Sequence, residues 1–134
     1  VSLLAMSASD LDLPDSSVKC LTISFGLRNV TEYSRALKEF YRVLEPGGSL
    51  FIMDFFRPRP SVKRRLFDLY FHRILPSIGG AISDRKAYKY LPESVKGFVS
   101  FEELCSDLSK VGFVHQGQQE YLFSYCRMLH LSKT

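Results

Sequence analysis

The sequence predicts an α/β fold in which parallel strands alternate with helices and an antiparallel strand pair follows at the end of the chain. Residues 20–25 and 49–55 are strongly apolar or β-branched, and the segment between them has helical periodicity. This order is typical of a right-handed β-α-β crossover. Residues 113–121 and 123–131 are two further strand-like runs, which favours an antiparallel pair.

The first part of the chain predicts two strands and the loops that follow them. Residues 1–6 are an apolar run that suits a strand, and a polar loop follows at Ser7-Ala8-Ser9-Asp10. Residues 13–17 form a turn cluster. Residues 20–25 contain five apolar or β-branched residues in six, so we expect a central parallel strand that is covered on both faces and ends at Gly26.

A helix is expected between this strand and the next, with Thr31 as its N-cap. Pro46-Gly47-Gly48 should end the helix and turn the chain into the strand at 49–55. The helical spacing brings one apolar face together, made of Tyr33, Ala36, Leu37, Phe40, Tyr41 and Leu44.

Helical signals also dominate the region between this strand and the terminal pair. After Pro60, apolar residues between 62 and 75 cover more than one face of a helix, and a short helix is expected at 92–97. Ser100 and Glu103 have the spacing of a capping box, and Gly112 supplies a C-terminal stop for the helix between them.

Charge and composition restrict the class of protein. The 134 residues are 46% hydrophobic, enough for one globular domain, and the net charge is +4. Such a charge excess attracts phosphates of an anionic membrane or of nucleic acid, or it forms a solvated helix face. Here the excess gathers in one cluster, made of Arg57, Arg59, Lys63, Arg64 and Arg65.

The cysteines and the hydropathy indicate the compartment. Cys20, Cys105 and Cys126 are widely spaced, which indicates reduced thiols in a cytosolic or matrix-like compartment. No segment approaches the roughly 20 apolar residues that span a bilayer, so we expect a soluble or peripheral protein. His72 and His115 lack the spacing of metal ligands, as does His130, and we infer no metal site.

Candidate site residues follow the expected strands, because ligands of open α/β sheets bind beyond the carboxyl ends of the strands. These ends carry Ser7-Ala8, residues 24–29 and residues 54–57. Arg28 and Asn29 offer guanidinium and amide donors that suit a phenolate, an enolate oxygen or an ordered water. Alternatively, Arg28 caps a helix or pairs with a carboxylate.

Two segments carry a resemblance to a known family. TISFGLRNV at 22–30 and EPGGSLFIMDF at 45–55 resemble the ubiquinone/menaquinone biosynthesis C-methyltransferases, which are class I S-adenosylmethionine-dependent methyltransferases with a Rossmann-like fold. The resemblance implies that residues 1–134 are a single partial domain, the C-terminal part of such an enzyme without its N-terminal glycine-rich cofactor-binding half.

The resemblance also implies roles for particular residues. It assigns Ser7, Ala8 and Ser24 to S-adenosylmethionine, and Arg28 and Asn29 to catalysis on the substrate. YKYLPES resembles a family element on the quinone-binding side and implies substrate contacts for two tyrosines, Tyr88 and Tyr90. Two positions depart from the family pattern: Ser7 stands where Asp or Asn is usual, and Lys19 reverses a usual negative charge.

The function implied is C-methylation of a prenylated benzoquinol or naphthoquinol in ubiquinone or menaquinone biosynthesis. The alternative is a truncated, non-catalytic remnant or an interaction module that needs a partner chain, either a complementing methyltransferase half or a second copy. Nucleic-acid binding through the basic cluster is the weakest hypothesis. We expect a cytoplasmic protein, with peripheral contact to the inner membrane through residues 57–65, on the matrix side in a eukaryote.

Overall fold

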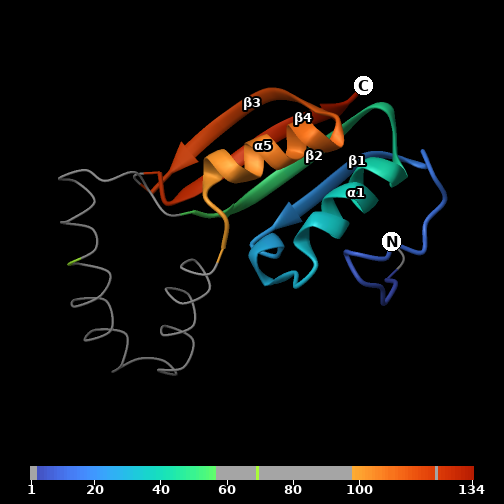
Figure 1. Cartoon of the computed structure of the whole chain (residues 1–134), viewed down its shortest axis with the longest axis horizontal. Coiled ribbons are helices and arrows are strands. Elements are labelled where there is room, and N and C mark those ends of the chain that lie inside the picture. The colour runs from blue at the N-terminus through green and yellow to red at the C-terminus, as the bar shows by residue number, and fades with distance from the viewer. Residues whose placement is uncertain (1–2, 57–68, 70–97, 123) are drawn as a thin grey trace.

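The computed structural model describes residues 3–56, 69, 98–122 and 124–134, and the architecture rests on these. A four-stranded sheet has the order β1-β2-β4-β3. β1 and β2 are parallel, whereas β4 runs antiparallel to both β2 and β3 (Figure 1). The predicted α/β class, the parallel neighbours and the terminal antiparallel pair are therefore confirmed. The strands are β1 (Val18–Ser24), β2 (Leu44–Phe55), β3 (Phe113–Tyr121) and β4 (Cys126–Lys133).

Two helices, α1 (Tyr33–Val43) and α5 (Phe101–Val111), cover one face of the sheet (Figure 1). They bury alternate residues of the central strands, because successive side chains of a strand point to opposite faces. The resulting core combines one stripe from each helix with one face of β2 and β4, and its main members are Leu37, Phe40, Leu104, Leu108, Leu50, Ile52, Leu129 and Leu131.

The helix at α1 is confirmed, but its predicted cap is wrong. Glu32, not Thr31, occupies the N-cap position, and no side chain caps the helix there. The carbonyl of Glu32 accepts hydrogen bonds from the backbone N–H groups of Arg35 and Ala36, both at 3.0 Å, so the helix begins one residue later than the Thr31 cap required.

The Pro-Gly-Gly segment does not separate α1 from β2 as predicted. α1 ends at Val43 and β2 begins at once with Leu44. Leu44 pairs with Val18, and the next paired residues are Cys20 and Ser49, so residues 45–48 form an irregularity within the parallel ladder. Gly47 has a φ of +78°, which glycine adopts without the steric penalty of a side chain. The turn is therefore present, but as a bulge in the strand.

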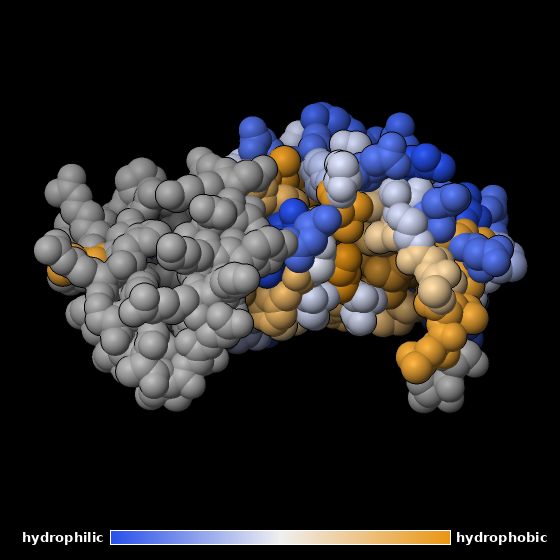
Figure 2. Space-filling model, turned by 90° about the horizontal axis from the view of Figure 1, so that it is seen from below, coloured by the Kyte–Doolittle hydropathy of each residue, from blue (hydrophilic) through white to orange (hydrophobic). Residues whose placement is uncertain are grey.

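β1 is not the expected strand with both faces covered. It lies at the margin of the described sheet, and Cys20, Thr22 and Ser24 are exposed on the face opposite the helices. The strand predicted at 1–6 is also wrong over the described residues 3–6, which form no ladder with any described strand. Leu3 and Leu4 are 95% and 66% exposed. Hydrophobic side chains reach the surface at this N-terminal end and in the middle of the face in Figure 2.

The C-terminal elements match the prediction closely. Ser100 Oγ accepts from the N–H of Glu103, the Glu103 side chain accepts from the N–H of Ser100, and Gly112 ends α5 in the left-handed conformation. The last strand begins at Cys126, later than predicted, because Leu122 and Ser124 adopt positive φ in the connection after β3.

Several predictions lie outside the described residues. These are the basic cluster at 57–65, the helices expected at 62–75 and 92–97, and the tyrosines Tyr88 and Tyr90. Within the described residues, no helix has the length and apolar character needed to cross a membrane.

Candidate functional site

The site forms where β1 and β2 end side by side. Ser24, the last residue of β1, pairs with Met53 of β2, so the loop after β1 meets the end of β2. This arrangement is the one expected for a ligand edge of an open α/β sheet. A short 3-10 helix, η1 (Leu27–Asn29), follows and carries Arg28 and Asn29.

Phe25 organises the loop between β1 and η1. Its backbone N–H donates to the carbonyl of Met53 at 2.8 Å, which extends the pairing with β2. Its φ of 56° then turns the chain out of the strand. The Phe25 carbonyl accepts from Arg28 Nη1 at 2.9 Å and from Asn29 Nδ2 at 3.5 Å. One carbonyl therefore holds both predicted catalytic side chains.

Arg28 is ion-paired to a buried carboxylate. Its Nη1 lies 2.5 Å from Asp54 Oδ1, and the two side chains are 7% and 0% exposed. Asp54 also accepts from the backbone N–H of Arg28 at 3.2 Å and from that of Phe55 at 2.8 Å. The carboxylate pairing left open for Arg28 is thus present. We assigned no role to Asp54 from the sequence. An acidic residue near the end of an apolar strand could nevertheless have indicated a partner for Arg28.

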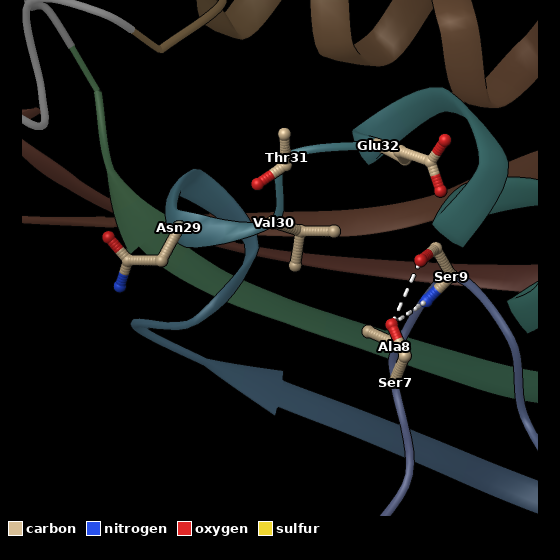
Figure 3. Close-up of a pocket in the computed structure, with 7 residues that line it drawn as sticks. All are labelled: Ser7, Ala8, Ser9, Asn29, Val30, Thr31 and Glu32. Atoms are coloured by element: carbon tan, nitrogen blue, oxygen red, sulfur yellow. Dashed lines mark hydrogen bonds between the residues drawn. The ribbon is translucent and has the colours of Figure 1, made fainter.

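An open pocket lies beside η1. Its volume is about 590 Å³, and it brings together Ser7 and Ala8 with Asn29 (Figure 3). The Asn29 amide points away from the serines in this view. Ser24 and Arg28 do not line the pocket, and Ser24 is exposed at the end of β1. The complete lining is Ser7, Ala8, Ser9, Asn29, Val30, Thr31 and Glu32.

The serine side of this pocket is a compact turn. Ser7 Oγ and Ser9 Oγ lie 2.9 Å apart, and the Ser9 N–H donates to Ser7 Oγ at 3.3 Å. The N–H of Asp10 donates to the carbonyl of Ser7 at 3.1 Å. These bonds fix the hydroxyl of Ser7 at the mouth of the pocket, where Asp or Asn would extend further.

Arg42 and Glu39 of α1 hold the chain that follows this turn. Arg42 Nη2 donates to Glu39 Oε2 and to the Leu11 carbonyl, both at 2.8 Å, while Nη1 donates to the Leu13 carbonyl at 2.8 Å. The Leu11 N–H donates to Glu39 Oε2 at 3.0 Å. Hydrogen bonds from Arg42 and from the Leu11 N–H lower the pKa of Glu39 to about 2.

The interactions of Glu39 with Arg42 and with the Leu11 N–H should make the free energy of unfolding depend on pH. A carboxyl whose pKa is lower in the folded than in the unfolded state stabilises the fold above its unfolded value, here 4.5, and loses that contribution as the pH falls toward 2. Across this pH range, the free energy of unfolding in urea should be larger for the unmodified chain than for Glu39→Gln, and the difference should shrink as the pH falls. Parallel stability curves for the two proteins would contradict the assignment.

No cluster of metal-ligating side chains occurs in the part of the chain that the structure describes. Within these ranges, no group of three or more His, Cys, Asp or Glu side chains could hold an ion. The polar groups at the sheet edge are the paired Arg28 guanidinium and Asp54 carboxylate, an amide and hydroxyls, and such groups hydrogen-bond the oxygen and nitrogen atoms of organic ligands.

Several solved structures of similar shape are named as methyltransferases, at sequence identities that show the fold alone. One is a possible histamine N-methyltransferase from Thermotoga maritima, described as SAM-dependent, with a TM-score of 0.67 at 23% identity. The match includes 100% of this chain and 65% of that protein. A SAM-dependent methyltransferase from Aquifex aeolicus has a TM-score of 0.64 at 17% identity, with 99% of this chain matching 55% of it. The [4+2]-cyclase SpnF reaches 0.66 at 15% identity, with 97% of this chain matching 54% of it, so this fold also occurs in a protein named for another reaction.

Relatives identified by sequence similarity indicate a narrower family than the shared fold does. The ubiquinone/menaquinone biosynthesis C-methyltransferase UbiE of Geobacter sulfurreducens is 42% identical over 113 residues, which are 84% of this chain and 44% of that protein. The protein of the same name from Campylobacter jejuni is 40% identical, across 99% of this chain and 57% of its own length. The chain thus spans about half the length of these curated relatives. The model of the ubiE/COQ5 methyltransferase family matches residues 1–132, and the chain belongs to that family.

Proposed function

We propose that this chain forms the substrate side and part of the cofactor side of an S-adenosylmethionine-dependent C-methyltransferase acting on a prenylated benzoquinol or naphthoquinol. The observation that supports the proposal is the loop at 25–29, which holds Arg28 and Asn29 where β1 and β2 end, beside a pocket lined by Ser7 and Ala8. The names of the curated relatives support the substrate class.

The pocket is compatible with part of a nucleoside cofactor. Its volume of about 590 Å³ lies in the range of small-molecule sites, and its hydroxyl groups suit the polar rim of an adenine or a ribose. In this proposal Ser7 and Ala8 contact the adenine end, and Ser24 contacts the cofactor from the end of β1. S-adenosylmethionine would supply the methyl group, with the rest of its binding surface provided by residues beyond the described ones.

Arg28 and Asn29 orient the oxygen of the acceptor. A guanidinium is a cation with donors and no acceptor, so Arg28 stabilises a phenolate rather than taking its proton. Asp54 and the Phe25 carbonyl hold the guanidinium in one orientation. An ionised ring oxygen raises electron density on the neighbouring ring carbon. Bound S-adenosylmethionine would supply the methyl group to that carbon as its S–CH3 bond breaks, with S-adenosylhomocysteine as the leaving group and the ring proton lost to solvent afterwards, provided that the two reacting atoms are aligned.

A chimeric enzyme tests this proposal. Residues 1–134 replace the matched segment of the Campylobacter jejuni relative, so that the chain is joined to the remainder of a related fold. The probe is a reduced diprenyl-1,4-naphthoquinol with an unsubstituted ring carbon, and the readout is transfer of a labelled methyl group to the ring. We expect transfer by the chimera and loss of at least about a hundredfold in Arg28→Ala, the size of a charge-stabilising contact. A folded chimera that binds S-adenosylmethionine but transfers no methyl group would refute the proposal.

A non-catalytic role with a partner chain is the second candidate, favoured by β1 at the margin of the described sheet and by the half-length match to the relatives. In this case the chain alone binds no S-adenosylmethionine and gains binding when mixed with the N-terminal remainder of a relative. Calorimetry of the chain, the remainder and their mixture measures this gain of binding, and a methyl-transfer assay of the mixture distinguishes the two roles, because a partner module restores binding without methyl transfer.

A further inference from the structure

We propose that Phe25, supported by Phe55, is the surface on which the aromatic ring of the acceptor stacks. The inference rests on the proposed function and deepens it by assigning the residues that recognise the ring. Phe25 is an exposed, conformationally strained aromatic residue at the ligand edge, and it is bonded through its backbone to Arg28 and Asn29.

The backbone of Phe25 is unusual for its residue type. Its φ of 56° is in the left-handed region, which bulky side chains rarely adopt, and such strain gathers at ligand sites. Gly26 follows directly and could take this conformation without a side-chain penalty, yet its φ is −112°. The strained conformation therefore falls on Phe25, whose side chain is exposed, and not on Gly26.

The Phe25 ring is not a core side chain. It is 37% exposed, and it packs on Phe55 with ring centroids 5.0 Å apart and an interplanar angle of 30°. Phe55 is half-buried and stands 5.7 Å from the Arg28 guanidinium. The pair thus forms a supported aromatic surface with a positive charge at its border.

This juxtaposition fits a hydroxylated aromatic ring. The ring face of a quinol would stack on Phe25, since aromatic side chains favour offset contacts with other rings. The same ligand's oxygen would then be close to the two donors that the Phe25 carbonyl holds. Phe25 does not line the pocket of Figure 3, whose nearest loop residue in the sequence is Asn29.

The test uses the chimera described above and three variants. Phe25→Gly removes the ring and relieves the backbone strain, so a folding failure is not expected, and Phe25→Tyr keeps the ring. Leu122→Gly is the matched control, because Leu122 has a φ of 51°, is 57% exposed and follows β3, which is separated from β1 by β2 and β4 in the sheet. All three are compared by circular dichroism before assay.

The expected result is a quinol KM raised about tenfold in Phe25→Gly, the size of one aromatic contact, with the dissociation constant of S-adenosylmethionine unchanged. Leu122→Gly should keep the original KM, and Phe25→Tyr, which keeps the ring, should restore most of the affinity lost in Phe25→Gly. Equilibrium dialysis of oxidised diprenyl-1,4-naphthoquinone gives a readout independent of methyl transfer, and Phe25→Gly should weaken this binding by the same factor.

The outcomes separate the two proposals. Quinone binding that depends on Phe25 in a chimera without methyl transfer supports the ring surface and refutes the enzymatic function. Methyl transfer with equal KM values for Phe25→Gly and Leu122→Gly refutes the ring surface alone. A folded chimera that binds no quinone also refutes it.

Discussion

Arg28→Met should destabilise the chain by about 3–5 kcal/mol, the cost of removing one partner from a buried ion pair. Asp54 is fully buried, and without the guanidinium its charge keeps, among the described residues, the backbone N–H groups of residue 28 and Phe55. The free energy of unfolding in urea measures this loss.

An exposed ion pair supplies the control for this experiment. Arg35 is 58% exposed and lies 3.6 Å from Glu32, so Arg35→Met should cost no more than about 1 kcal/mol. The double variant Arg28→Met/Asp54→Leu should recover most of the lost stability, because no buried charge remains. Similar losses for Arg28→Met and Arg35→Met would show that the buried pair does not contribute as described.

Phe56→Ala should cost about 3–5 kcal/mol through the cavity it leaves in the core. Phe56 is 1% exposed at the end of β2, and its ring packs edge-on against Phe101 at 5.4 Å and tilted against Phe98 at 5.6 Å. Its N–H also donates to the Tyr125 carbonyl at 2.7 Å, and the variant keeps this bond. Urea unfolding again gives the value.

Two further variants check that the effect comes from lost packing. Phe56→Leu should lose clearly less than Phe56→Ala, since it leaves a smaller cavity. Val114→Ala changes a residue that is 43% exposed on β3 and should stay within about 0.5 kcal/mol of the unmodified chain. A loss below about 1 kcal/mol for Phe56→Ala would contradict the described core.

Local interactions were predictable from the sequence. The capping box joins residues three apart, and the helical stripe of α1 repeats every three or four residues, so both patterns are visible in a short window. The parallel pairing of β1 with β2 followed from the helix between them, because such a crossover permits few topologies.

Interactions between distant segments were not predictable in the same way. The Arg28–Asp54 pair spans 26 positions, and the hydrogen bond from Tyr33 Oη to Asp107 at 2.7 Å spans 74. The exposure of β1 depends on which strands lie beside it, and composition alone cannot specify this. The resemblance selected Ser7, Ala8 and Asn29, which line one pocket in the structure, but it assigned no role to Asp54 or Phe25.

The marginal position of β1 has a consequence for handling the chain in solution. On its outer side no described strand pairs with its peptide groups, so these amides should exchange with deuterium faster than those of β2, which has a neighbour on each side. An unpaired strand edge is also a template for other chains and favours filament growth at high concentration. Lys19, exposed on this strand, places a positive charge that repels an approaching second copy.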